Sequence, residues 1–281
     1  MAKWAIIVPI ILSNGLEKRY DMGSNTIEVQ IAVAKVGKYA SSESGDTVEM
    51  IERPHGGVSV VVADGQMSGK GAKRISNLVV RKTLSLLAEG VRDGAAARAA
   101  HDYLYAHRGG AVQATLNIVS VDLDSKTIVI SRNSHCPVIM MSQNGLEVID
   151  EPSSPVGIYP YTKPHITEVP ISPFLCVVVF TDGLLSAGQR RGQQMDIAAA
   201  VMDRQRRDLR QNAQTLADDL LNEGITLDGG RPSDDISVLV VNIVPSDVTS
   251  DRELVRRMNV SFPVRSGWYV PPEDQRVTVE K

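Results

Sequence analysis

The sequence has few aromatic residues, few cysteines and no excess of either charge. Phe, Trp and Tyr make up only 4% of its 281 residues, so the aromatic platforms on which single-stranded nucleic acids stack would be scarce. Lys and Arg number 30 against 33 Asp and Glu, which gives a net charge of −3. A nucleic-acid-binding domain carries a basic excess, and we therefore expect no nucleic-acid partner.

The two cysteines, Cys136 and Cys176, are too few for a disulfide framework or a thiolate metal site. Cys176 lies inside an apolar run, where a cysteine is a packing residue. Cys136 follows His135 directly, but adjacent side chains on an extended chain point to opposite faces. The sequence therefore indicates no catalytic Cys/His pair, and it contains no GxSxG nucleophile elbow.

Long hydrophobic runs are also missing. The longest extends over nine residues from Trp4 to Leu12, whereas a membrane-spanning helix needs about 20 apolar residues. Lys3 before this run gives the outline of a weak signal peptide, but no small-x-small cleavage site follows. The pattern favours an N-terminal strand or ragged start over secretion, and we expect a cytoplasmic protein without a membrane partner.

The sequence does contain a series of strand-like runs and two groups of helices. Thr26–Lys35 alternates apolar and polar residues, which is typical of a half-buried strand. Further strands are predicted at Val58–Ala63, Ala114–Val121, Thr127–Ser131, Val138–Met141, Leu146–Ile149, Phe174–Phe180 and Ile236–Val244. Helices are predicted at Ala72–Ala88, Ala95–Ala106 and Asp196–Glu223. Strands in antiparallel pairs with clustered helices favour an α+β fold over a doubly wound parallel sheet.

Several aspartates stand at the ends of predicted strands. Asp64 and Asp182 each follow a buried strand and precede a glycine, Asp234 comes just before another strand, and Asp46 lies in a predicted loop. Carboxylates gathered at one edge of a core would repel one another unless a divalent cation neutralised them. Oxygen-only ligands suit Mg²⁺ or Mn²⁺, whereas Zn²⁺ favours His or Cys. The alternative is that each Asp-Gly pair simply makes a turn, and the residues alone leave both interpretations open.

A family resemblance rests on the order of these motifs. In sequence order they are SGD ending at Asp46, VVVADGQMSGKGA containing Asp64, ATLNIVSVDLD, NSHCPV, SPVGI, FTDGLL containing Asp182, and SDDISVLVV containing Asp234. This series resembles the metal-dependent Ser/Thr protein phosphatases (PPM family). Within that family it is similar to the bacterial branch of sporulation stage II protein E and the sigma-factor regulatory phosphatases.

The resemblance runs from about Thr26 to Val244. It implies a four-layer α-β-β-α sandwich in which two antiparallel sheets are flanked by helices. The implied organisation is a leader or extra strand at 1–25, the phosphatase domain at 26–244 and a C-terminal extension at 245–281.

The resemblance also implies two Mn²⁺ or Mg²⁺ ions at one edge of the sandwich. Asp64 would bridge both ions, the Gly65 carbonyl would bind one of them, Asp182 and Asp234 would hold the other, and Asp46 would add a further, often water-mediated carboxylate, with Asp235 and Gly183 in support. Asp234 is preferred to Asp235 because it occupies the first position of the family's motif.

The implied reaction is hydrolysis of phosphoserine or phosphothreonine by water that the two metals activate, without a phosphoenzyme. By the same resemblance, the substrate is a phosphorylated regulatory protein such as an anti-sigma-factor antagonist. The rival hypothesis is a non-catalytic phosphoprotein-binding module, a pseudophosphatase, on the same fold.

Several residues depart from the family pattern. Gln66 stands where many eukaryotic relatives have a histidine that can protonate the leaving oxygen, and Met67 takes a place usually held by glycine. The eukaryotic phosphate-binding arginine has no clear counterpart, although Lys38 lies nearby. His135 is interpreted as a structural, core or hydrogen-bonding residue. The sequence assigns no substrate-binding residue.

Overall fold

The computed structural model describes residues 27–246 and 256–262. The chain divides into two units, Met1–Val248 and Thr249–Lys281, each described by itself. In the second unit, the described residues 256–262 are exposed and form no regular element. The predicted leader at 1–25 lies outside the described residues, and the predicted domain boundaries stay predictions.

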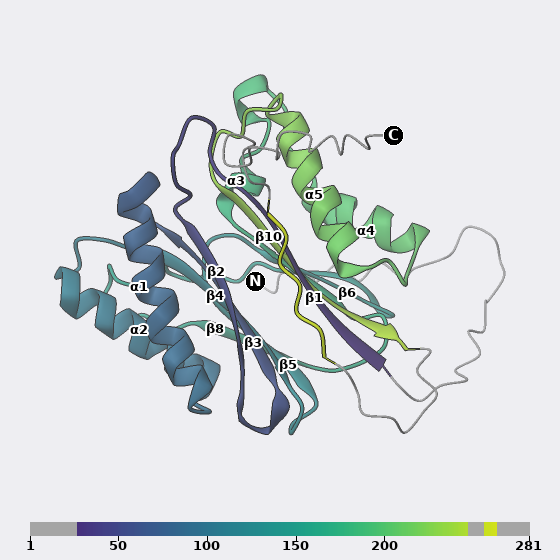
Figure 1. Ribbon diagram of the computed structural model, residues 1–281, viewed down its shortest axis with the longest axis horizontal. Coiled ribbons are helices and arrows are strands. Elements are labelled where there is room, and N and C mark those ends of the chain that lie inside the picture. The colour runs from purple at the N-terminus through teal and green to yellow at the C-terminus, as the bar shows by residue number, and fades with distance from the viewer. Residues whose placement is uncertain (1–26, 247–255, 263–281) are drawn as a thin grey trace, which may run out of the picture. The chain divides into compact units, whose positions relative to one another are not determined.

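The first unit contains two antiparallel sheets of five strands each (Figure 1). In spatial order, the first sheet consists of β1 (Ile27–Val36), β10 (Ile236–Pro245), β9 (Cys176–Phe180), β6 (Val138–Ser142) and β7 (Gly145–Ile149). The second consists of β2 (Asp46–Glu52), β3 (Val58–Gly65), β4 (Ala114–Asp122), β5 (Thr127–Asn133) and β8 (His165–Pro170). Every neighbouring pair is antiparallel, as the hairpin pattern of the sequence predicts.

The core between the sheets is made of β-branched and other aliphatic side chains. Val60, Val62 and Ile130 contribute to it from the second sheet, and Leu239 and Val241 from the first. Alternate residues of the same strands point outward and are buried as well, so these strands are apolar on both faces. This explains the continuous apolar runs in the sequence.

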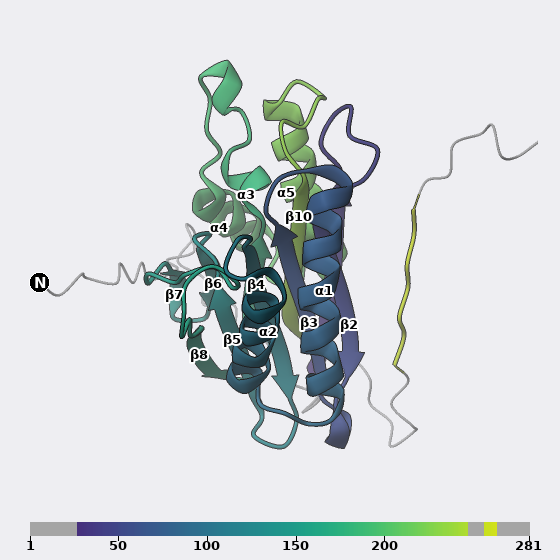
Figure 2. The same cartoon turned by 90° about the vertical axis from the view of Figure 1, so that its left-hand side faces the viewer.

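Helices cover both outer faces (Figures 1 and 2). Helices α1 (Gly69–Ala88) and α2 (Asp93–Arg108) pack on the second sheet, and α4 (Ile197–Arg207) and α5 (Ala213–Leu227) pack on the first. The short elements are α3 (Asp182–Leu185) and the 3₁₀ turns η1 (Pro54–Gly56) and η2 (Gln189–Arg191). The predicted α+β fold, a four-layer α-β-β-α sandwich, is confirmed. Among the described residues, no helix has both the length and the apolar character to cross a membrane.

The structure corrects some local predictions. Asp46 begins strand β2 instead of lying in a loop, and the exposed edge strand β8 was not predicted. The single helix predicted over Asp196–Glu223 is two helices. The second begins anew because the side chain of Asn212 caps it, accepting a hydrogen bond from the Gln214 backbone N–H.

Candidate metal centre

The predicted aspartates meet where strands of both sheets end. Asp46 and Asp64 lie directly opposite each other in the β2–β3 ladder. Asp182 is the first residue of α3, two positions after β9 ends at Phe180. Asp234 lies two residues before β10 begins at Ile236, and β10 is the neighbour of β9. Both sheets therefore deliver acidic residues to one edge of the sandwich.

Asp46 joins the two sheets at this edge. Its side chain is fully buried, at 0% exposure. Its Oδ2 accepts hydrogen bonds from Thr181 Oγ1 at 2.9 Å and Ser237 Oγ at 2.6 Å, both on the first sheet's side. Its Oδ1 is buried and accepts no N–H or hydroxyl hydrogen bond among the described residues, and the facing Asp64 carboxyl, when protonated, hydrogen-bonds to the Asp46 carboxylate. One oxygen is thus fixed in place, and the other is left with unused acceptor capacity.

Two lysines hold the backbone of Asp46. Lys35 Nζ, from β1, donates to the Asp46 carbonyl at 2.6 Å, and Lys73 Nζ, from α1, donates to the same carbonyl at 2.7 Å. Lys73 also donates to Thr47 Oγ1 at 2.9 Å. The start of β2 is therefore fixed from the first sheet and from the covering helix together.

The neighbouring aspartates 234 and 235 do different things. Asp235 is buried, and its two carboxylate oxygens accept the backbone N–H groups of Lys38 and Gly45, each at 2.8 Å. It thus anchors both ends of the loop that leads into Asp46. Asp234 is only half-buried, and its Oδ1 lies 3.7 Å from Lys38 Nζ. Asp234 Oδ1 also accepts the Asp235 backbone N–H at 3.0 Å, and the choice of Asp234 as the metal ligand of the pair stays a prediction.

The glycines after Asp64 and Asp182 are required by close approach of the backbone. A Cβ added to Gly65 would lie 2.1 Å from the Ala72 carbonyl oxygen in α1, and one added to Gly183 would lie 2.0 Å from the Asp235 carbonyl oxygen. Neither glycine has a positive φ. Each glycine therefore lets another segment pack directly behind an aspartate, a role that turn formation alone does not require.

The electrostatics of this edge are those of crowded carboxylates. Burial, and then the charges of Asp46, Asp182 and Asp234, raise the pKa of Asp64 to about 9. Burial also raises the pKa of Asp46 to about 6, although the hydrogen bonds from Ser237 and Thr181 oppose the shift. The pKa of Asp182 is raised by burial and by Asp234. Negative charge is therefore costly here without a nearby cation.

The donor set fits a hard divalent cation, since it consists of carboxylate oxygens with one buried acceptor unused. The present side-chain arrangement is not a finished coordination shell. Within residues 27–246 and 256–262, Asp, Glu, His and Cys side chains form no group of three or more that could hold a metal ion. Asp46 and Asp64 face each other in the ladder, and the charges of Asp182 and Asp234 are near enough to raise the pKa of Asp64. Metal ligation by these aspartates stays a prediction.

Other residues singled out in the sequence lie near the same edge. The His135 side chain is 58% exposed with Nε2 at 3.9 Å from Asp182 Oδ2, so His135 is not a core residue, and the hydrogen-bonding alternative stays a prediction. Gln66 pairs with Gln113 in both directions, through its backbone N–H at 3.0 Å and its side-chain Oε1 at 3.1 Å. Burial raises the pKa of both Cys136 and Cys176 to about 12, so neither thiol is an activated nucleophile.

Sequence reasoning missed the residues that orient the aspartates. Thr181 follows the apolar run FLCVVVF, and Ser237 is the second residue of the otherwise apolar run ISVLVV. A hydroxyl residue at these two positions was the signal that the sequence offered. Lys35 and Lys73 carry no such signal, because lysines at a strand end and on a helix face are ordinary surface residues.

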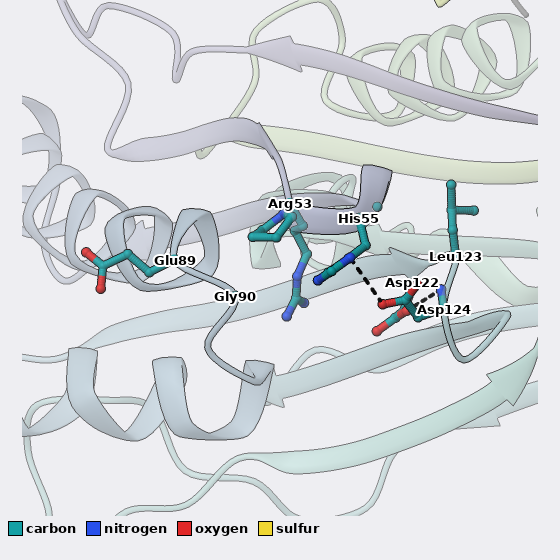
Figure 3. A pocket seen from close by; sticks show the side chains of 9 residues that line it. Arg53, His55, Glu89, Gly90, Asp122, Leu123 and Asp124 are labelled. Carbon is teal, nitrogen blue, oxygen red and sulfur yellow. Dashed lines mark hydrogen bonds and ion pairs between the residues drawn. The ribbon is translucent and has the colours of Figure 1, made fainter.

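A separate pocket of about 300 Å³ lies at the opposite end of the β2–β3 ladder (Figure 3). It is lined by Arg53, Pro54, His55, Gly57, Glu89, Gly90, Asp122, Leu123 and Asp124. The Arg53 guanidinium is already bound to Asp93 Oδ2 at 2.8 Å and to the Val91 carbonyl at 3.0 Å. These internal partners assign Arg53 a structural role.

A four-layer sandwich with acidic strand ends at one edge has the architecture of a PP2C-type phosphatase domain. The PP2C phosphatase domain and a regulatory-domain fragment of SpoIIE from Bacillus subtilis superpose with a TM-score of 0.67 at 20% identity, covering 78% of this chain and 64% of that chain. The catalytic domain of the serine/threonine phosphatase PstP, in complex with 2 manganese ions, gives a TM-score of 0.58 at 16% identity, covering 78% of this chain and 100% of that chain. These likenesses establish the fold.

Residues 54–244 match the family model described as Stage II sporulation protein E (SpoIIE). Stage II sporulation protein E of Bacillus subtilis (strain 168) is 21% identical over 221 residues. The aligned region is 78% of this chain and 26% of that protein, so the chain spans about a quarter of the relative's length. The chain belongs to the SpoIIE family.

Proposed function

We propose that this chain is a divalent-cation-dependent phosphatase that hydrolyses phosphoserine or phosphothreonine on a regulatory protein. The observation that carries the proposal is the convergence of Asp46, Asp64, Asp182 and Asp234, with Asp46 Oδ1 buried and accepting no N–H or hydroxyl hydrogen bond among the described residues. Burying several carboxylates without a counter-charge is unfavourable. A bound cation would remove this penalty and account for their grouping.

The residues that would hold two Mn²⁺ or Mg²⁺ ions are Asp46, Asp64, the Gly65 carbonyl, Asp182 and Asp234. The manganese in the related PstP structure supports this choice of ion. When bound, such ions act as Lewis acids and lower the pKa of water, which supplies a nucleophile at neutral pH. A phosphoenzyme is then unnecessary, in keeping with two buried, protonated thiols.

The chain's own contribution is positioning. Thr181 and Ser237 restrict the rotation of the Asp46 carboxylate, and Asp235 fixes the loop that precedes it. Gln66 cannot act as a general acid, and its bonds to Gln113 instead hold the backbone that follows Gly65. Proton delivery to the leaving oxygen therefore falls to solvent in this proposal.

The test is hydrolysis of p-nitrophenyl phosphate and a phosphoserine peptide by the full chain in Mn²⁺ and Mg²⁺ titrations. We expect Asp182→Ala to lower kcat by about 10²–10³-fold, the loss typical of an electrostatic catalyst. Asp203→Ala, which removes an exposed carboxylate from α4, is the control and should behave as wild type. A wild-type protein inert with both ions, or an Asp182→Ala variant of full activity, would refute the proposal.

The alternative is a non-catalytic phosphoprotein-binding module. It is favoured by Gln66 in place of a proton donor and by the unfinished grouping of the carboxylates. Titration calorimetry with a phosphorylated anti-sigma-factor antagonist, the kind of partner that the family resemblance implies, separates the two. Binding without release of phosphate supports the module, whereas turnover supports the phosphatase.

A further inference from the structure

Exposed arginines and a tyrosine lie beside the segment that leads to Asp234. Arg190 and Arg191 lie in η2, Arg231 lies in the turn before β10, and Tyr39 lies in the loop between β1 and β2. All four residues are exposed. We call this set, Tyr39, Arg190, Arg191 and Arg231, the basic rim. Figure 2 shows the β1–β2 loop, in purple, and the loop before β10, in yellow-green, at the same end of the structure as α3.

Direct contacts tie the basic rim to the candidate site. The Arg190 guanidinium donates to the Ser233 carbonyl at 3.5 Å, and Ser233 immediately precedes Asp234. Arg231 stacks over the Tyr39 ring with its guanidinium carbon 5.2 Å from the centroid. The Tyr39 backbone N–H donates to the Pro232 carbonyl at 2.9 Å. Arg190 thus contacts the residue next to the candidate metal ligand Asp234, and Arg231 precedes Asp234 by three residues.

The loops that carry the rim share an anchor. Asp228 Oδ1 accepts the backbone N–H of Gly188 at 2.8 Å, and Asp228 Oδ2 accepts that of Ser233 at 2.6 Å. Gly188 precedes η2, and Ser233 precedes Asp234. The Asp228 carboxylate therefore holds the loop that carries η2 next to the segment that carries Asp234. The arginines of η2 thus have a fixed position relative to the acidic edge.

The rim arginines keep their charge available. Within the described residues, Arg190, Arg191 and Arg231 have no carboxylate within 4.0 Å; their contacts are to carbonyl oxygens and the Tyr39 ring. Arg204 on α4 is different, because it pairs with Glu223 at 2.7 Å and with Asp219 at 3.6 Å. The basic patch of α4 is therefore held in close ion pairs at Arg204. In the rim, Arg190 interacts electrostatically with a nearby carboxylate, that of Asp228, but it forms no ion pair within 4.0 Å in the described part of the chain.

We propose that the basic rim docks acidic side chains that flank the phosphorylated residue of a protein substrate. The inference rests on the proposed function, since it assigns a substrate class to the same site. Guanidinium groups bind carboxylates in a bidentate geometry, and a cationic surface beside the site steers an acidic partner toward it. The substrate class is a phosphoprotein with Asp or Glu close to its phosphoserine or phosphothreonine.

The experiment compares two phosphoserine peptides that differ only in having Glu or Gln at the flanking positions. For the full chain with Mn²⁺ at low salt, we expect kcat/KM to be about tenfold higher for the Glu peptide, as several exposed ion pairs of modest strength would give. In Arg190→Gln/Arg231→Gln we expect a preference of about twofold or less. The control Arg92→Gln/Arg98→Gln removes the same charge from exposed positions on and beside α2, and should keep the wild-type preference.

The preference is a ratio within one protein, so a variant that folds poorly or turns over slowly still reports it. Loss of the preference at about 1 M salt supports an ionic origin. The proposal is overturned if wild type does not discriminate, if the rim variant keeps the preference, or if the control loses it equally. If no protein hydrolyses any substrate, the proposed function fails, and calorimetric affinities for the two peptides then decide the docking role by the same ratio.

Discussion

The two ends of the β2–β3 ladder each bury an aspartate, and they treat it in opposite ways. At the far end, Asp93 is 6% exposed in its side chain and contacts the Arg53 guanidinium at 2.8 Å. Ser120 Oγ donates to its other oxygen. At the candidate site, Asp46 has only two hydroxyl donors among the described residues, both to one oxygen, and the Asp64 carboxyl opposite it.

The difference is informative because the residue type and burial are the same. An aspartate with a built-in arginine is electrically complete and stabilises the fold in any buffer. Asp46 lies among other carboxylates and keeps a raised pKa even with the Lys35 charge nearby. In the proposed function, a cation from solution offsets the remaining negative charge. The far end is thus a structural cluster with paired charges. The near end has an excess of carboxylates, as a cation-binding site would.

The largest expected effect comes from breaking the far-end pair. Arg53→Met leaves the Asp93 charge buried without its partner, and we expect a loss of about 3–5 kcal/mol in the free energy of unfolding. Urea denaturation of the full chain measures it. The loss should be the same with and without Mg²⁺, because this cluster lies away from the carboxylate edge.

The double variant Arg53→Met/Asp93→Leu provides the control, since replacing both charges should restore most of the stability. A loss below about 1 kcal/mol in Arg53→Met would show that the pair is not structural. A loss that Mg²⁺ reverses would show that the two ends are not independent.

The second prediction concerns the near end and its pH dependence. The folded-state pKa values of Asp46, about 6, and Asp64, about 9, are raised above their ordinary values. The stability linked to these protons is complete below the unfolded pKa of about 3.9 and is lost as pH rises through the folded values. With EDTA, the wild type should therefore lose stability relative to Asp64→Asn as the pH rises from about 5 to about 9, by at most about 1.4 kcal/mol per pH unit.

Added Mg²⁺ should reverse the comparison and make the wild type more stable than Asp64→Asn. At about 100 times its Kd, a cation that binds only the folded state adds about 2.7 kcal/mol to the wild type. Asp64→Asn should gain little, because it lacks one carboxylate of the proposed metal site. Thermal unfolding at several pH values, with EDTA or Mg²⁺, gives both comparisons. Parallel pH curves for wild type and Asp64→Asn in EDTA would contradict the crowded-carboxylate account.

Much of the fold could be predicted because its strands are apolar and their turns are explicit. The hairpin of β6 and β7 was predicted from the Asn144-Gly145 pair between two short runs, although the turn residues are Gln143 and Asn144 and Gly145 begins β7. Strand β2 was missed because its sequence, DTVEMIE, carries acidic residues that an edge strand exposes. Asp46 was consequently predicted in a loop, although the residue itself was correctly singled out.

The site could be predicted only as far as strand ends and residue types allow. That Asp64 lies opposite Asp46 depends on register, and that Thr181 and Ser237 hold Asp46 depends on how one sheet packs over the other. Neither follows from spacing in the sequence. The sequence also does not reveal that Asp235 binds the backbone of the loop at Lys38 and Gly45, because these residues lie about 190 positions away in the chain.

The smallest expected effect concerns the left-handed residues near each end of the ladder. Met67 has a φ of 81° and His55 a φ of 65°, a region that costs a residue other than glycine about 1–2 kcal/mol. Met67 is 71% exposed, so its side chain contributes little packing. After allowing for the greater freedom of glycine in the unfolded chain, we expect Met67→Gly to gain about 0.5–1 kcal/mol in the free energy of unfolding, with a smaller gain for His55→Gly because histidine tolerates this region better.

Met67→Ala is the matched control: it removes the side chain but keeps the strained backbone, so it should gain nothing. Both glycine variants should raise the urea midpoint, but only Met67→Gly should change the Mg²⁺ affinity measured by calorimetry. Met67 follows Gly65 by two residues in the segment that leads into α1, whereas His55 lies beside the far-end pocket. Equal changes in Mg²⁺ affinity for both variants would show that the two ends are coupled, and the contrast between a structural and a cation-dependent end would then fail.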